Sequence, residues 1–198
     1  MPNLEKFEKI HYYKNVIEDT RYLIDLIEST DSKLSDTTSI PQWQDWQASG
    51  DIPYVFGKQK RFTEDVDLDR DPDIIEINTI LKKAIIDASN LYANEYHLDL
   101  GILMPISISK YETSKSMGPH VDDYNDDENP NISVVLYLND DYEGGQLHFK
   151  EQNVTIKPEA GSIVIFPSVA PYYHESMPVT SGVKYMSPGF WRKTNKVV

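Results

Sequence analysis

The chain has 198 residues, with 32 acidic against 19 basic side chains and a net charge of −13. This charge disfavours a long anionic partner such as duplex nucleic acid or an acidic membrane surface. The chain contains no cysteine, which excludes disulfides, thiolate metal sites and cysteine nucleophiles. Any transition metal must therefore be held by histidine and carboxylate groups.

The first residues, MPNLEKFEKIHYYKN, are charged and lack the apolar run of a signal peptide. Nor does any stretch approach the ~20 apolar residues that a membrane-spanning helix needs. We therefore expect a cytoplasmic protein with no membrane partner. The sequence leaves the oligomeric state open.

The first hundred residues predict mostly helical structure. Residues 15–30 favour an amphipathic helix, and a second helix is expected to begin at Asp71-Pro72, an N-cap followed by proline at the first helical position. The apolar side chains of the first helix are Val16, Ile17, Leu23, Ile24 and Ile27. Those of the second are Ile74, Ile77, Leu81, Ile85, Ala88 and Tyr92.

From about residue 101 the pattern changes to short β-rich runs separated by turn residues. These runs are Ile102–Tyr111, Ile132–Asn139, Gln146–Phe149, Val154–Ile156, Ser162–Phe166 and Gly182–Trp191. Such close spacing predicts an antiparallel barrel or sandwich, and helices followed by strands give the α+β class with helices on one side of the sheet. We expect residues 1–198 to form one domain, with 1–100 as mostly helical support and 101–193 as the β-rich core.

The pattern His-x-Asp occurs twice, so by itself it decides little. His97 falls where the second helix is expected to end, where its charge can favour the helix C-terminus, and Asp99 fits a turn. His120 instead follows a strand and the turn-like stretch Ser116–Pro119. If residues 120–122 are extended, His120 and Asp122 project to the same side and can bind one metal.

His174, far along the chain and beyond the run Ser162–Phe166, is the candidate for a third ligand. Two histidines, one carboxylate and open positions are the donor set of non-haem Fe(II) oxygenases. Open positions let a co-substrate and O₂ bind the metal directly. His148 lies within an expected strand, where we interpret it as facing solvent or bonded locally, and Gly144-Gly145 is interpreted as a hairpin turn.

The ordered motifs between Tyr111 and Trp191 resemble the 2-oxoglutarate/Fe(II) dioxygenases, and within them the prolyl 4-hydroxylase-like group. The matching pieces are His120–Asp122, Ser133–Asn139, Tyr142–Phe149, Pro158–Pro167 and His174–Tyr185. Each piece is weak alone, but their order and spacing are specific. The resemblance implies a double-stranded β-helix, also called a jelly roll, packed on N-terminal helices. It implies Fe(II) bound by His120, Asp122 and His174, with 2-oxoglutarate and O₂ as co-substrates and ascorbate as a further candidate.

The same resemblance assigns roles to residues around the iron. Lys184, ten positions after His174, would bind the far carboxylate of 2-oxoglutarate, assisted by the Tyr137 hydroxyl, with Tyr111 as a further co-substrate contact. A cation and a hydroxyl donor suit this carboxylate because a buried unpaired charge is costly. Tyr124 and Trp191 are candidates for lining the substrate mouth. No catalytic side chain is expected beyond the metal ligands.

The implied reaction is hydroxylation of a C–H bond, coupled to conversion of 2-oxoglutarate to succinate and CO₂. The expected substrate is a prolyl residue of a peptide or protein. The alternatives are the same chemistry on a free amino acid or other small molecule, and a non-catalytic jelly-roll binding module. Base demethylation is disfavoured by the negative charge. The acidic run Asp122–Glu128, five acids in seven residues, predicts a solvated loop, with a substrate lid as the alternative.

Overall fold

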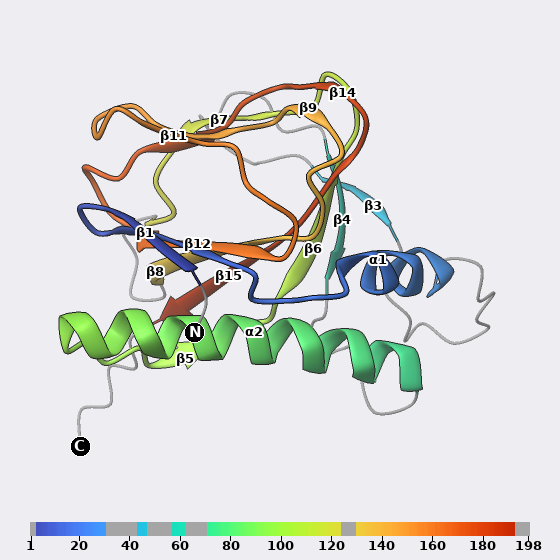
Figure 1. Cartoon of the computed structure of the whole chain (residues 1–198), viewed down its shortest axis with the longest axis horizontal. Coiled ribbons are helices and arrows are strands. Elements are labelled where there is room, and N and C mark those ends of the chain that lie inside the picture. The colour runs from blue at the N-terminus through green and yellow to red at the C-terminus, as the bar shows by residue number, and fades with distance from the viewer. Residues whose placement is uncertain (1–2, 31–42, 47–56, 62–70, 124–129, 193–198) are drawn as a thin grey trace.

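The computed structural model describes residues 3–30, 43–46, 57–61, 71–123 and 130–192. Within these ranges two layers of strands lie above two helices (Figure 1). The helices are α1 (Thr20–Ser29) and α2 (Pro72–Tyr96). The strands of the larger sheet are β1 (Asn3–Phe7), β2 (Ile10–Lys14), β3 (Gln44–Trp46), β4 (Gly57–Arg61), β5 (Ile102–Leu103), β6 (Ser107–Tyr111), β8 (Pro130–Tyr137), β12 (Ser162–Pro167) and β15 (Lys184–Arg192). Their order is β1-β2-β12-β8-β15-β6-β4-β3, with β5 paired to β15.

A smaller sheet packs against the face of the larger sheet that is turned away from the helices (Figure 1). Its strands, in the order β11-β10-β13-β7, are β11 (Val154–Ile156), β10 (Leu147–Phe149), β13 (His174–Ser176) and β7 (Met117–His120). Two further strands, β9 (Glu143–Gly144) and β14 (Val179–Ser181), pair with each other. All these pairs are antiparallel, so neighbouring side chains along a strand alternate between the two faces of each sheet.

This alternation gives the larger sheet two separate cores. Along β8, Val134 and Leu136 face the helices, whereas Val135 and Tyr137 face the smaller sheet. The helix-facing core includes Leu23, Ile27, Ile77, Leu81, Ile85, Val134, Leu136, Ile163, Ile165 and Trp191. The interior core, between the two sheets, includes Ile10, Tyr12, Tyr111, Val135, Tyr137, Tyr142, Leu147, Phe149, Ile156, Val164, Phe166 and Met186.

Helix α2 follows its sequence signals closely. The Asp71 carboxylate accepts the backbone N–H groups of Asp73 and Ile74 at 2.9 and 3.4 Å, and Pro72 opens the first turn. All six side chains of the predicted apolar face are buried, and α2 contacts β8 and β12. At the other end, exposed His97 adopts a left-handed conformation, and its N–H donates to the carbonyl of Ala93. The predicted start and face of this helix are confirmed.

The first hundred residues are less helical than predicted, because β1 to β4 extend the larger sheet. Helix α1 begins at Thr20, with the Asp19 carboxylate accepting the Tyr22 N–H at 3.0 Å, and not at residue 15. Val16 and Ile17 precede it, and their N–H groups donate to the carbonyl of Gly161 at 2.7 and 3.2 Å. These tertiary hydrogen bonds replace the helical turn that the apolar spacing predicted.

Three predictions in the β-rich half were also wrong. The run Ile102–Tyr111 is divided into β5 and β6, and the stretch Ser116–Pro119 lies largely in β7 and is not a turn. Gly144-Gly145 is not a hairpin, because β9 pairs with β14 whereas β10 pairs with β11 and β13. Both glycines have positive φ, and a Cβ on Gly144 would lie 2.2 Å from the carbonyl oxygen of Pro178. The two glycines let the chain pass from the β9–β14 pair to the smaller sheet at a position where the backbone has no room for a Cβ atom.

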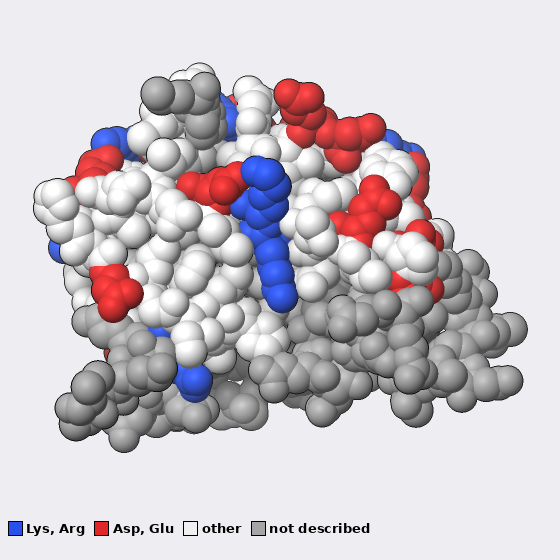
Figure 2. Space-filling view, turned by 90° about the horizontal axis from the view of Figure 1, so that it is seen from below, with Lys and Arg blue, Asp and Glu red and all other residues white. Residues whose placement is uncertain are grey.

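The surface on the α2 side carries acidic groups at several separate places, and basic groups form a narrow central strip besides smaller separate patches on the described part of this face (Figure 2). This distribution follows the acidic excess of the chain. None of the helices in the described ranges is long and apolar enough to cross a membrane.

Candidate metal and co-substrate site

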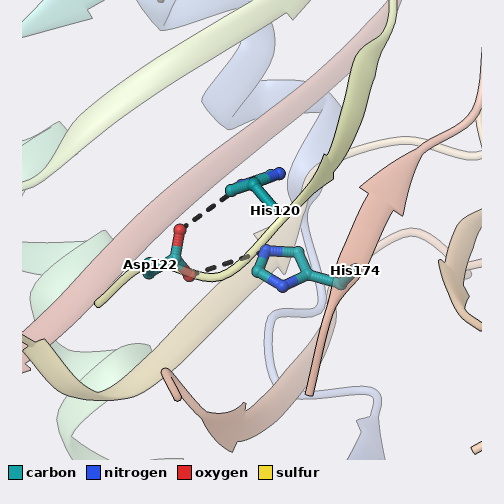
Figure 3. A group of neighbouring side chains, drawn as sticks. All are labelled: His120, Asp122 and His174. Atoms are coloured by element: carbon teal, nitrogen blue, oxygen red, sulfur yellow. Dashed lines mark ion pairs between the residues drawn. The ribbon is translucent and has the colours of Figure 1, made fainter. Parts of the chain in front are cut away.

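Three side chains with metal-binding atoms converge inside the molecule, at the edge of the smaller sheet. His120 ends β7, Asp122 follows two residues later, and His174 begins β13, directly opposite His120 in the strand register. The candidate ligand atoms of the three lie within 4.8 Å of one another, and all three residues are buried (Figure 3). Pairing of β13 with β7 thus brings together donors that are far apart in the sequence.

The orientation of both imidazoles leaves the same nitrogen facing the carboxylate. His120 Nδ1 lies 2.7 Å from the carbonyl oxygen of Gly118, and His174 Nδ1 lies 3.2 Å from that of Tyr172. A carbonyl oxygen only accepts, so each Nδ1 carries the proton and donates it. Each Nε2 faces Asp122, at 3.4 Å for His120 and 3.5 Å for His174. This tautomer leaves both Nε2 lone pairs available to a metal.

The protonation states of His174 and Asp122 also favour cation binding. Burial lowers the pKa of His174 to about 4, although Asp122 opposes the shift. For Asp122, burial raises the pKa, but His174, His120 and the Ser133 hydroxyl together bring it below its ordinary value. His120 is also desolvated by burial, but the Asp122 hydrogen bond and charge leave its pKa above the usual value. A neutral imidazole and an ionised carboxylate at neutral pH are the forms that ligate metals.

A buried cation lies deeper in the same interior. The side chain of Lys184 is 0% exposed, and its Nζ donates to the carbonyl of Gly145 at 2.6 Å and to the Ser176 hydroxyl at 2.9 Å. Within the described ranges no acidic side chain forms an ion pair with it. Burial lowers the pKa of Lys184 to about 7. An ammonium without a counter-charge is costly to bury, so this position suits an anionic ligand.

Three tyrosines surround this ammonium. Its Nζ lies 5.2 Å from the ring centre of Tyr137, 5.8 Å from that of Tyr111 and 6.0 Å from that of Tyr142. The hydroxyls of Tyr111 and Tyr142 are buried and have no hydrogen-bond partner in the described part of the chain. Two unsatisfied hydroxyls beside a lone ammonium can donate to a carboxylate. The residues present therefore fit one end of a dicarboxylate such as 2-oxoglutarate.

The family comparison agrees with this geometry, since residues 106–192 match the model of the 2OG-Fe(II) oxygenase superfamily. This segment belongs to the 2OG-Fe(II) oxygenase superfamily. It includes every residue of the two clusters described above. A provisionally named prolyl 4-hydroxylase of Acanthamoeba polyphaga mimivirus is 33% identical over 70 residues, which are 31% of this chain and only 29% of that relative.

Solved structures share the fold over nearly the whole chain. A viral collagen prolyl hydroxylase from Paramecium bursaria Chlorella virus-1, solved as a 2OG complex, aligns with a TM-score of 0.66 at 17% identity, covering 96% of this chain and 97% of its own. A prolyl-4-hydroxylase from Pseudomonas putida gives 0.68 at 18% identity, covering 94% of each chain. These likenesses bear out the predicted jelly roll within an α+β architecture.

Trp191 does not line a substrate mouth in this structure. It is 8% exposed, belongs to the helix-facing core, and its indole N–H donates to the Ser89 hydroxyl of α2 at 2.9 Å. Along β15 it is seven positions after Lys184, an odd offset, so the two side chains face opposite sides of the sheet. Phe190, opposite Ser133 in the register, is on the interior side instead. Tyr124 lies outside the described residues.

His148 and His97 behave as predicted. His148 Nδ1 lies 2.8 Å from the Thr155 hydroxyl, which satisfies it locally on the smaller sheet. His97 is exposed, and the Asp99 carboxylate accepts the N–H of Gly101 at 3.1 Å in the turn after α2. Neither residue of that second His-x-Asp pair joins the buried cluster.

Sequence reasoning missed Ser133, Tyr142 and Ser176, whose hydroxyls complete the site. Ser176 carried a usable signal, because it is two positions after His174 and residues two apart in a strand face the same side. Ser133 and Tyr142 carried none, since their contacts depend on which strands are neighbours.

Proposed function

We propose that this chain is an Fe(II)- and 2-oxoglutarate-dependent dioxygenase that hydroxylates prolyl residues in a peptide or protein. The observation that carries the proposal is the buried cluster of His120, Asp122 and His174. When bound there, iron together with 2-oxoglutarate and O₂ would supply the oxidising chemistry that yields succinate, CO₂ and a hydroxylated C–H position. Three protein ligands are few enough to leave metal positions open for both co-substrates.

In this proposal the protein residues bind and orient the reactants. The Nε2 atoms of His120 and His174 and a carboxylate oxygen of Asp122 hold the metal. Their Nδ1–H bonds to Gly118 and Tyr172 fix the ring orientations before any metal arrives. The Phe166 and Phe149 rings, with centroids 4.5 and 5.8 Å from that of His174, pack beside the site and exclude water.

The cluster around Lys184 would receive the far carboxylate of 2-oxoglutarate. Lys184 supplies the charge, and the hydroxyls of Tyr111, Tyr137 and Tyr142 are the available donors in this buried region. The ligand would satisfy two hydroxyls that are otherwise unpaired, which favours binding of an anion over an uncharged group.

The choice of a prolyl substrate is supported by the names of the relatives. One curated relative and both solved structures reported above are named as prolyl hydroxylases. We also propose that residues 1–198 act as one domain, because β1 to β4 belong to the same sheet as β6, β8, β12 and β15.

The metal and co-substrate parts are tested together by anaerobic titration with Fe(II) and then 2-oxoglutarate. A weak visible metal-to-ligand band should develop, and it should be lost in His174→Ala. His148→Ala is the matched control, because that imidazole is bonded locally and lies outside the cluster. Absence of the band in the unmodified protein would favour a non-catalytic binding module.

The substrate part is tested by succinate formation in the presence of O₂ and ascorbate. Proline-containing peptides are compared with their alanine-substituted partners, with free amino acids as a further set. We expect only the proline peptides to stimulate succinate and to gain the mass of one oxygen atom. If none does so while the visible band is intact, the prolyl assignment is wrong.

A further inference from the structure

Asp122 is held by a hydroxyl that neither the motif nor the family match accounts for. The Ser133 Oγ, on β8, donates to Asp122 Oδ2 at 2.5 Å. The other carboxylate oxygen, Oδ1, lies 3.4 Å from His120 Nε2, and Oδ2 itself also lies 3.5 Å from His174 Nε2. Ser133 and Asp122 are both buried, so water does not compete freely for this bond.

A second serine completes a directed chain of hydrogen bonds. Ser168, fully buried after β12, has its Oγ 2.8 Å from the Ser133 Oγ. An ionised carboxylate only accepts hydrogen bonds, so the Ser133 hydroxyl must donate its one hydrogen to Asp122. Ser168 must therefore donate to Ser133, which polarises the Ser133 hydroxyl and strengthens its bond to the carboxylate.

The backbone at Ser168 anchors the same loop. Its carbonyl oxygen accepts the N–H groups of Asp122 and Asp123 at 3.0 and 3.1 Å, and its own N–H donates to the carbonyl of Asn131 at 3.0 Å. The segment after β7, the start of β8 and the segment after β12 are thus joined at one residue. Main chain and side chain of Asp122 are both fixed relative to β8.

We propose that Ser133, supported by Ser168, is a positioning residue that makes Asp122 a one-oxygen ligand. Both carboxylate oxygens face an imidazole, but the hydroxyl already occupies a lone pair of Oδ2, which leaves Oδ1 with more lone-pair capacity for a metal. A carboxylate free to rotate could bind a metal through both oxygens, which would occupy a position that a co-substrate needs. This inference rests on the proposed function, because it assigns a role to neighbours of the proposed metal ligands.

The test uses Co(II), whose visible absorption bands report the number and arrangement of its ligands. The full-length protein, Ser133→Ala and Ser168→Ala are titrated with Co(II) without oxygen or 2-oxoglutarate. Loss of such a supporting hydrogen bond typically weakens metal binding by about 10- to 100-fold. We expect that loss in Ser133→Ala with altered Co(II) bands, and a smaller loss in Ser168→Ala, where the direct bond to Asp122 remains.

Ser187→Ala is the matched control. Ser187 is fully buried on β15, and its hydroxyl donates to the Ser107 carbonyl at 2.8 Å, away from the cluster. It removes the same kind of group from the same sheet, so its Co(II) affinity and bands should stay those of the unmodified protein. Thermal unfolding of each metal-free variant shows that the fold is retained, and Ser168→Ala keeps the comparison informative should Ser133→Ala be unstable.

Unchanged Co(II) bands in Ser133→Ala would overturn the proposal, whatever the affinity. Equal losses in Ser133→Ala and Ser187→Ala would overturn it too, because they would reflect general weakening of the sheet. If the unmodified protein binds no Co(II), the proposed function fails, and the role of Ser133 fails with it. Normal binding in the unmodified protein with parent-like Ser133→Ala removes only the positioning role.

Discussion

The two cores on either side of the larger sheet are built from the same strands but differ in chemistry. The helix-facing core is mostly aliphatic, as with Leu81 against the sheet residues Leu136 and Ile163, and it also holds the aromatic side chains of Tyr13, Tyr92 and Trp191. The interior between the sheets instead encloses Lys184 and the cluster of His120, Asp122 and His174 beside its apolar groups.

The difference shows where stability and function are separated. Apolar burial stabilises the fold in proportion to the area removed from water. Each buried polar group without a partner lowers stability by about 1–3 kcal/mol. The interior holds two such hydroxyls, on Tyr111 and Tyr142, besides an ammonium without a counter-charge. Substitutions in the helix-facing core should therefore alter stability alone. Substitutions of the buried polar groups in the interior should weaken ligand binding while stabilising the ligand-free protein.

The largest expected effect is on stability. Leu81→Ala truncates a fully buried side chain of the helix-facing core and should lower the free energy of unfolding by about 2–5 kcal/mol. Co(II) affinity at a temperature where the variant is folded should not change. Urea unfolding and Co(II) titration measure the two quantities. A large loss of Co(II) affinity would show that the two cores are coupled.

Lys184→Met should weaken ligand binding without lowering stability, the opposite of the effect expected for Leu81→Ala. Methionine fills a similar space without a charge, so the ligand-free protein should become more stable. Affinity for 2-oxoglutarate should fall by about 10- to 150-fold, because a hydrogen bond to a charged group contributes about 1.5–3 kcal/mol. Calorimetric titration of the Co(II)-loaded protein measures this, with exposed Lys83→Met as the control. Equal affinities in the two variants would separate Lys184 from co-substrate binding.

The pH dependence of 2-oxoglutarate binding should report the same ammonium. The pKa of Lys184 is lowered from 10.5 to about 7, so above pH 7 the ligand-free pocket is mostly neutral and must take up a proton to pair with a carboxylate. Affinity should then fall with rising pH by up to about tenfold per unit. Titration in two buffers of different ionisation enthalpy measures the proton uptake. Lys184→Arg should remove the slope, because arginine stays charged.

The linked effect on stability has the opposite sign. Between pH 7 and 10.5 the unfolded chain binds a proton at Lys184 that the folded chain does not. The contribution of this group to the free energy of unfolding therefore rises with pH across that window. Comparing the urea midpoints of the unmodified protein and Lys184→Met at several pH values isolates the contribution of Lys184. If the two midpoints change with pH in the same way, this expectation is wrong.

The smallest expected effect is that of Tyr142→Phe. Removing a buried hydroxyl without a partner should stabilise the ligand-free protein slightly, and it should weaken 2-oxoglutarate binding by about 0.5–1.5 kcal/mol. Tyr13→Phe is a suitable comparison, because that hydroxyl is bonded to His11 in another part of the molecule. If both variants bind 2-oxoglutarate equally well, Tyr142 is only a packing residue.

Much of this architecture could be predicted because its signals are local. Asp71-Pro72 marks the start of α2, the three- and four-residue spacing from Ile74 to Tyr92 marks its buried face, and the prediction needed only neighbouring residues. The charged hairpin of β1 and β2 was missed for the opposite reason. Its inner strand, β2, is stabilised by pairing with β12, about 150 residues away, so the sequence of the hairpin alone resembles a solvated segment.

The sequence by itself determined the residue types of the site: two histidines, one carboxylate and one lysine in a recognisable order, in a chain without cysteine. Only the tertiary structure decided how they meet. Pairing of β13 with β7 sets His174 opposite His120, and pairing of β15 with β6 sets Lys184 opposite Tyr111. The same register turned Trp191 toward α2, because a one-residue offset in a strand selects the opposite face and local sequence does not specify which face is interior.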